Sequence, residues 1–142
     1  EALDKLPAGL RKRIESLSIK HDASKTSGGY LRKGFEEVSD VSQTVGAVHP
    51  IIRKHPESGR EVLYLGRRLN AYIMGMSVED SEALLDEIWS YTTRVEHTWH
   101  HQWRVGDVVF WDNRTVMHRR DAFDAGSRRI MHRTQIADRP SP

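Results

Sequence analysis

Apolar residues recur every three or four positions near the start of the chain, which is the spacing of one face of an α-helix. This set contains Leu3, Leu6, Leu10, Ile14 and Leu17. Pro7 is compatible with a first helical turn, because its missing N–H would have no partner there. The pattern therefore predicts a helix over about residues 7–16.

A second helical pattern begins at Ser77. Ser77 followed by Asp80 resembles a capping box with Asp in place of Glu or Gln, which marks the start of a helix. The apolar stripe that follows contains Leu84, Leu85, Ile88 and Trp89. We predict a helix from Ser77 to about Tyr91, with its carboxylates on the solvated side.

Other stretches alternate with a period of two, which is typical of strands with one buried face. The predicted strands cover residues 17–21, 45–54, 61–66, 95–103, 107–111 and 128–136. The sequence Pro56-Glu57-Ser58-Gly59 between the second and third is a good hairpin turn. His21 and Asp22 are expected as exposed turn residues. Helices combined with antiparallel hairpins predict an α+β fold.

Residues 22–44 are polar and rich in Ser, Gly and Lys, which predicts a mobile loop or lid. Gly29 and Gly34 have the spacing of a phosphate-binding loop. Phe35 and Glu36 stand where such a loop requires Lys and Ser or Thr, so this function is excluded.

Composition narrows the class of protein. The length of 142 residues suits a single domain over residues 1–142, and 22 basic against 20 acidic residues argues against a nucleic-acid surface. Cysteine is absent, which excludes thiolate catalysis and disulfides. Since no apolar run reaches the roughly 20 residues of a membrane span, we expect a cytoplasmic protein without a membrane partner.

The chain begins at Glu1 and not at Met, so we expect a piece of a longer protein. The oligomeric state is left open, and a homo-oligomer is compatible with the sequence.

The last predicted strand carries the candidate chemistry. Arg129 and Arg133 share one face of it, with their Cα atoms roughly 13 Å apart at about 3.3 Å per residue. The planar fork of arginine suits bidentate binding of a carboxylate. His118 precedes Arg129 across a turn-rich stretch. This arrangement indicates a small-anion site beside a metal-ligand candidate, although from spacing alone a structural role for His118 is favoured.

Other histidines are better explained by structure. His55 and Glu57 have the spacing of two ligands of a non-heme iron site, but they lie within the hairpin turn. His97 and His101 share a face of a predicted strand and lie too far apart for an ordinary chelate. We interpret both sets as structural.

The segment from Trp111 to His118 reads W-D-N-R-x-x-x-H, and after 10 further residues Arg129 to Arg133 reads R-x-M-x-R. This combination resembles the taurine dioxygenase / 2,4-dichlorophenoxyacetate dioxygenase family of iron(II)- and 2-oxoglutarate-dependent oxygenases. The hairpin from His55 to Arg60 and the Trp103-Arg104-Val105-Gly106-Asp107 segment are similar to the family as well. The resemblance extends in order from Val48 to Ile136.

The resemblance implies a role for each matching residue. His118 resembles the distal histidine of the 2-His-1-carboxylate iron site, and Arg129 the arginine that binds 2-oxoglutarate. Arg133 resembles a second arginine that can meet the acidic group of the substrate. We interpret Trp111 as a core residue that packs beside the site. The implied reaction hydroxylates a small anionic substrate with molecular oxygen and releases succinate and CO2. We expect an aryloxyalkanoate-like or taurine-like substrate and favour a carboxylate.

One part of the family pattern is missing. The iron site also needs a His-x-Asp pair, which these 142 residues do not contain. We therefore expect the C-terminal half of a double-stranded β-helix, or jelly roll, with flanking helices and its N-terminal part missing, inactive by itself. The alternative is a non-catalytic jelly-roll module that keeps the arginines to bind a small anion.

Overall fold

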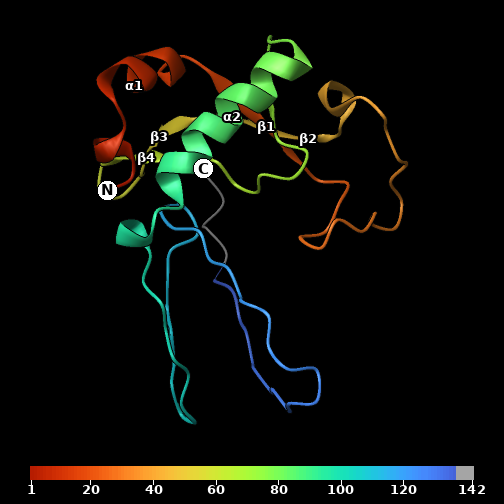
Figure 1. Cartoon of the computed structure of the whole chain (residues 1–142), viewed down its shortest axis with the longest axis vertical. Coiled ribbons are helices and arrows are strands. Elements are labelled where there is room, and N and C mark those ends of the chain that lie inside the picture. The colour runs from red at the N-terminus through yellow and green to blue at the C-terminus, as the bar shows by residue number, and fades with distance from the viewer. Residues whose placement is uncertain (137–142) are drawn as a thin grey trace.

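The computed structural model describes residues 1–136, and in Figure 1 helices cover two small antiparallel sheets. The regular elements, in chain order, are the 3-10 helix η1 (Leu3–Lys5), α1 (Ala8–Ile14), β1 (Ser18–Asp22), η2 (Val41–Gln43), β2 (Gly46–Pro50), β3 (Ile52–Lys54), β4 (Glu61–Leu63), β5 (Tyr72–Ile73), α2 (Val78–Thr92) and η3 (Val95–His97). The α+β character predicted from the sequence is therefore present.

The first sheet has the order β2-β1-β5, with both pairs antiparallel. Its register places Ile19 opposite His49 on one side and Ile73 on the other. Both isoleucines are fully buried and belong to the same core as the apolar face of α2. This sheet and α2 form the centre of the molecule.

The predicted strand 45–54 is interrupted at Ile51, which connects the two sheets. Its N–H donates to the carbonyl of Leu17 beside β1, while its carbonyl accepts from the N–H of Tyr64 beside β4. The side chain of Ile51 is fully buried. A bend here sends β3 away from β2 to form the second sheet with β4.

Both predicted helices are confirmed with slightly different ends. The α1 helix buries Leu10 and Ile14, as its periodicity predicts. In α2, the hydroxyl of Ser77 accepts a hydrogen bond from the N–H of Asp80 and donates to its carboxylate. The Ser77 hydroxyl therefore caps the helix and satisfies an N–H that the helix itself cannot pair. The Asp80 carboxylate bonds the Ser77 hydroxyl, whereas in a capping box it would accept the backbone N–H of Ser77.

The predicted strands at 95–103, 107–111 and 128–136 are wrong for the structure as described. Residues 95–97 form η3, and residues 98–136 contain no strand. In Figure 1 this segment, which we call the extension, leaves the body as two long excursions. Alternating side chains define two faces, but a strand also needs a neighbouring backbone to accept its hydrogen bonds. The jelly roll expected from the family resemblance is therefore not formed by the described residues.

The predicted loop at 22–44 has little regular structure, and its base is anchored. The carboxylate of Asp22 accepts from the N–H and the hydroxyl of Ser24, and Arg67 donates to the carbonyls of Asp22 and Lys25. Its mobility stays a prediction. Among the described residues there is also no helix long and apolar enough to cross a membrane.

Candidate functional site

The Trp111–His118 segment turns sharply at Asp112. The carbonyl of Asp112 accepts from the N–H groups of Thr115 and Val116, both at 3.1 Å, and its carboxylate accepts from the N–H of Arg114 at 2.8 Å. Aspartate favours such turns because its side chain can bond the backbone two residues on. Both the side chain and the carbonyl of Asp112 therefore hold the backbone of this turn.

This turn brings the two ends of the segment together. The ring centroids of Trp111 and His118 lie 4.9 Å apart with an interplanar angle of 50°. The His118 side chain is exposed, and no hydrogen-bond partner for its imidazole is found within residues 1–136. Within the described part of the chain, both ring nitrogens are therefore accessible to a ligand, and Trp111 lies beside this candidate metal ligand.

The arginines of the predicted anion site are exposed. The Arg129 guanidinium lies 5.8 Å from the centroid of the Phe123 ring, which is a cation–π distance. No described hydrogen bond or ion pair joins Arg129 or Arg133 to His118. Because residues 128–136 form no strand here, the shared face predicted for the two arginines is not fixed by a sheet.

An iron site of the expected class would need more ligands than His118 alone. A non-heme iron site of this class needs two imidazoles and a carboxylate around open positions. No group of three His, Cys, Asp or Glu side chains within residues 1–136 could hold a metal ion. Residues 1–136 therefore do not contain the complete ligand set of such a site, and His118 stays the single candidate ligand that the sequence predicts.

A separate hollow of about 810 Å³ lies between the loop and the start of α2. Its lining residues are Ser39, Asp40, Val41, Arg68, Leu69, Asn70, Val78 and Glu82. Arg68, its cation, already pairs with Glu82 and Asp86 at 2.7 Å each. The hollow therefore lacks an available positive charge for a small anion, and it does not contain the predicted site residues.

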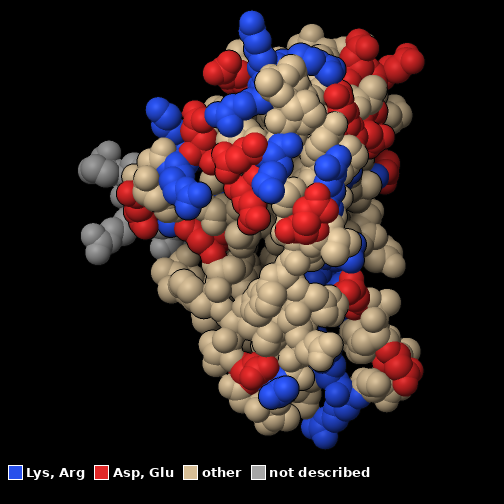
Figure 2. Space-filling view, turned by 60° about the vertical axis from the view of Figure 1, so that its left-hand side comes forward, with Lys and Arg blue, Asp and Glu red and all other residues tan. Residues whose placement is uncertain are grey.

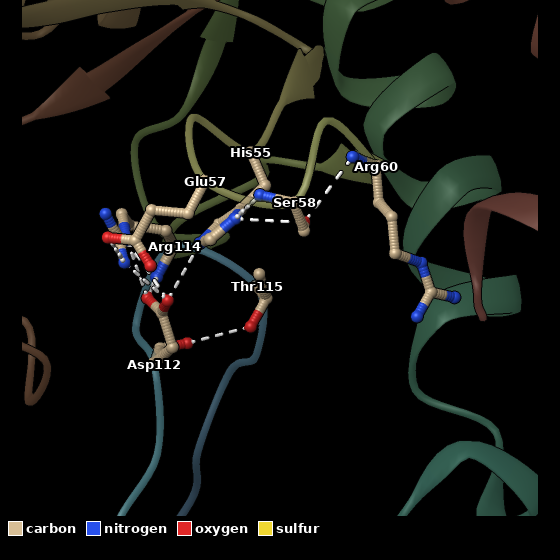
Figure 3. Close-up of polar contacts among 7 residues, drawn as sticks. All are labelled: His55, Glu57, Ser58, Arg60, Asp112, Arg114 and Thr115. Carbon is tan, nitrogen blue, oxygen red and sulfur yellow. Dashed lines mark hydrogen bonds and ion pairs between the residues drawn. The ribbon is translucent and has the colours of Figure 1, made fainter.

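A polar cluster joins the Trp111–His118 segment to the β3–β4 hairpin. His55 Nε2 lies 3.0 Å from the Asp112 carboxylate, although the two residues are 57 positions apart. Arg114 bonds the same carboxylate through Nε and a terminal nitrogen, and also contacts Glu57 at 3.4 Å. Figure 3 shows His55 and Asp112 facing each other, with Arg114 and Glu57 beside them and the Arg60 guanidinium directed away.

The charges of this cluster are complementary. The hydrogen bonds from Arg114, supported by His55, hold the pKa of the Asp112 carboxyl well below its usual range. His55 is buried, with 8% of its surface exposed, and its Nδ1 accepts from the N–H of Ser58 at 3.1 Å. The structural interpretation of His55 agrees with this position. Its pairing with Asp112 had no signal in the sequence, because the contact is between distant segments.

His21 and Asp22 differ from their predicted exposure. Asp22 is buried, and the His21 ring packs against the rings of His49 and Tyr64 with centroids 5.4 and 5.3 Å away. Burial, with the nearby His49, lowers the pKa of His21 to about 4. The prediction failed because the strand continues to Asp22, and β2 covers the pair.

Comparison with known proteins decides the family. The profile described as "Taurine catabolism dioxygenase TauD, TfdA family" matches residues 1–135, which includes the Trp111–His118 segment and both arginines. The chain belongs to the TauD/TfdA family. The family expected from the sequence motifs is thus confirmed.

Within the TauD/TfdA family, the chain is 34% identical over 145 residues to an (S)-phenoxypropionate/alpha-ketoglutarate-dioxygenase of Sphingobium herbicidovorans. It is 32% identical over 138 residues to an alpha-ketoglutarate-dependent 2,4-dichlorophenoxyacetate dioxygenase of Cupriavidus pinatubonensis. These matches cover 99% and 96% of this chain, and 50% and 47% of the relatives. The chain therefore spans about half the length of the curated TauD/TfdA relatives that it matches.

Solved structures agree with this assignment. A putative alpha-ketoglutarate dependent 2,4-D dioxygenase from Burkholderia xenovorans is 35% identical with a TM-score of 0.63, over 80% of this chain and 43% of that one. AAD-2 in complex with Mn(II) and N-oxalylglycine is 31% identical with a TM-score of 0.64, over 80% of this chain and 44% of its own. The similarity to the TauD/TfdA family is thus structural as well as sequential.

Proposed function

We propose that the protein carrying this chain is an Fe(II)- and 2-oxoglutarate-dependent dioxygenase that hydroxylates a small anionic substrate and releases succinate and CO2. The observation that carries the proposal is the family match over residues 1–135, which includes the spacing of His118, Arg129 and Arg133. The relative solved with Mn(II) and N-oxalylglycine, a metal ion and a small dicarboxylate, supports it.

In this proposal the chain supplies three of the necessary groups. His118 provides one imidazole ligand to iron, which supplies the oxidising chemistry when bound. Arg129 binds 2-oxoglutarate and Arg133 binds the anionic substrate, because a guanidinium fork matches a carboxylate bidentately. The other two iron ligands come from polypeptide outside these 142 residues.

The surface of the extension supports the need for further polypeptide. Its exposed apolar side chains include Trp99, Val105, Val108, Phe110 and Ile130, each at least 62% exposed. In Figure 2 the upper part of the molecule is densely charged, whereas the lower part, where the extension lies, is mostly uncharged. Large apolar side chains exposed in such number on one uncharged region are typical of an interaction surface. We propose that the additional polypeptide covers this surface and completes the jelly roll.

The substrate class follows from the cationic site and the relatives. We propose a carboxylate such as an aryloxyalkanoate, in keeping with the (S)-phenoxypropionate and 2,4-dichlorophenoxyacetate enzymes. A sulfonate or sulfate ester is the competing class, since a relative from Pseudomonas putida is named an alpha-ketoglutarate-dependent sulfate ester dioxygenase. Turnover of paired substrates that differ only in the acidic group would distinguish the two classes.

The deciding experiment is an anaerobic titration of the complete polypeptide with iron(II) and 2-oxoglutarate, followed by visible absorption. We expect a charge-transfer band that is lost in His118→Ala. Arg129→Lys should weaken 2-oxoglutarate binding, whereas Arg133→Ala should chiefly raise the KM of the prime substrate. A folded complete polypeptide without the band would contradict the oxygenase.

The rival function is a non-catalytic small-anion binding module. It is favoured by one observation, that residues 1–136 hold no three-ligand metal cluster. Such a module would bind 2-oxoglutarate or a related carboxylate without iron. Isothermal titration with 2-oxoglutarate in the presence of a chelator would show unchanged affinity for the module and lost affinity for the oxygenase.

A further inference from the structure

We propose that His55, Asp112 and Arg114 form a positioning cluster that fixes His118 relative to the β3–β4 hairpin. This inference rests on the proposed function only where it concerns iron. The placement of His118 itself can be tested without metal.

The first step is the anchor on the body. His55 is nearly enclosed, and both of its ring nitrogens are engaged. Because Nδ1 accepts the N–H of Ser58, the neutral ring must carry its proton on Nε2. Nε2–H therefore donates to the Asp112 carboxylate, so the tight 55–59 turn dictates where that carboxylate lies.

The second step is that the position of the Asp112 carboxylate fixes the backbone that leads to His118. One carboxylate oxygen of Asp112 accepts from the N–H of Arg114, and the Asp112 carbonyl closes the turn to Thr115 and Val116. The side chain that bonds His55 therefore also sets the backbone of the turn. His118 follows this turn directly and lies against Trp111, the residue before Asp112.

Arg114 strengthens the connection between the Asp112 turn and the β3–β4 hairpin. Two of its nitrogens bond the Asp112 carboxylate at 2.8 to 3.1 Å, which neutralises the carboxylate while leaving it bonded to His55. Its contact with Glu57 adds a second connection to the hairpin. Charge-assisted bidentate bonds are stronger and geometrically stricter than neutral ones. The extension is thus clamped to the body at the point from which His118 projects.

The chain contains a matched control for this cluster. Asp107 also accepts from a histidine, His101 Nε2 at 3.0 Å, and from a backbone N–H, that of Arg104 at 2.8 Å. All these residues belong to the extension, so the contact does not reach the body. Asp107→Asn therefore removes the same kind of interaction without disturbing the anchor.

The experiment uses the complete polypeptide, first without metal. We measure the imidazole proton resonance of His118, which is shifted by the ring current of Trp111, and then the affinity for iron(II). Asp112→Asn should move the resonance and weaken iron(II) binding about tenfold, the lower bound for groups that orient metal ligands. Asp107→Asn should change neither quantity. If both variants behave alike in the metal-free spectrum, the positioning cluster is refuted.

A second pair of variants distinguishes loss of the His55–Asp112 hydrogen bond from a general folding defect. His55→Gln keeps an N–H donor near the position of Nε2, whereas His55→Leu keeps the volume and removes the donor. We expect His55→Leu to reproduce the Asp112→Asn shift and His55→Gln to restore the wild-type resonance. The double variant His55→Leu/Asp112→Asn should be no worse than either single variant, because coupled residues are not additive. Equal effects of Gln and Leu would overturn the proposal.

The outcomes separate this inference from the proposed function. Loss of the charge-transfer band in the wild-type protein would contradict the oxygenase, yet the metal-free resonances would still test the cluster. A normal wild-type band together with an unmoved His118 resonance in Asp112→Asn would refute the cluster alone.

Discussion

Residues 1–97, which we call the body, and the extension, residues 98–136, differ in how their apolar side chains are covered. The body buries twelve apolar residues in a common core, from Leu3 to Ile88. In the extension none of the described residues is buried, although parts of its sequence have the pattern of strands. A helical stripe satisfies its backbone within itself, whereas an alternating segment depends on a neighbour. The comparison teaches that apolar patterning identifies a face but does not supply what covers it.

The largest expected effect is a change in amide hydrogen exchange of the extension between the 142-residue chain and the complete polypeptide. Amide hydrogen exchange in residues 98–136 should be fast in the 142-residue chain and slowed by about 10³-fold or more in the complete polypeptide, because covered strands exchange only by opening. Amides of β1 should be slow in both. Mass-spectrometric exchange on the two proteins makes the measurement, and equal rates in the extension would contradict the proposed covering.

The next largest effect is the difference in free energy of unfolding between an isoleucine substitution in the body and one in the extension. Ile88→Ala removes a fully buried side chain and should lower the free energy of unfolding by about 2–5 kcal/mol. The matched control Ile130→Ala, at a position 62% exposed, should change it by less than about 0.5 kcal/mol in the 142-residue chain. Urea denaturation followed by far-UV circular dichroism checks both values. Similar losses would mean that the extension is packed.

Lowering the pH should reduce the free energy of unfolding of residues 1–97, because His21 must then take up a proton on unfolding. Its folded pKa of about 4 lies below the unfolded value of 6.5, so the unfolded chain binds more protons between these pH values. The resulting stability is fully present above pH 6.5 and is lost as pH falls from 6.5 to 4. Allowing for solvent screening of this partly exposed group, we expect about 1–2 kcal/mol.

Urea midpoints measured across this pH window would test the His21 effect. His21→Asn should flatten the slope, and His132→Asn at an exposed position serves as the matched control. An unchanged slope in His21→Asn would assign the pH dependence to other groups.

The smallest expected effect lies at the start of α2. Ser77→Ala removes the cap that accepts the N–H of Asp80 and should cost about 1 kcal/mol. Ser90→Ala provides the control, because the Ser90 hydroxyl donates only to a carbonyl within the same helix. Thermal unfolding of the two variants gives the comparison, and a Ser77→Ala melting temperature equal to that of Ser90→Ala would exclude a stabilising cap.

The sequence by itself determined the two helices and the family. The apolar stripe that includes Leu10 and Ile14, and the cap residue Ser77, mark helices where helices are found, because helix formation uses bonds between residues close in sequence. The spacing of Trp111, His118 and Arg129 was sufficient for the family, because a motif is read along the chain. The turn at Asp112 was predictable for the same reason.

Only the tertiary structure decided which distant groups meet. The bend at Ile51, the burial of His21 and the bond from His55 to Asp112 each depend on backbone brought from elsewhere in the chain. The same dependence explains the failure of the strands predicted after residue 95. Their alternation was read correctly, but a β-strand is a property of a pair of segments, and the described chain does not bring a partner to them.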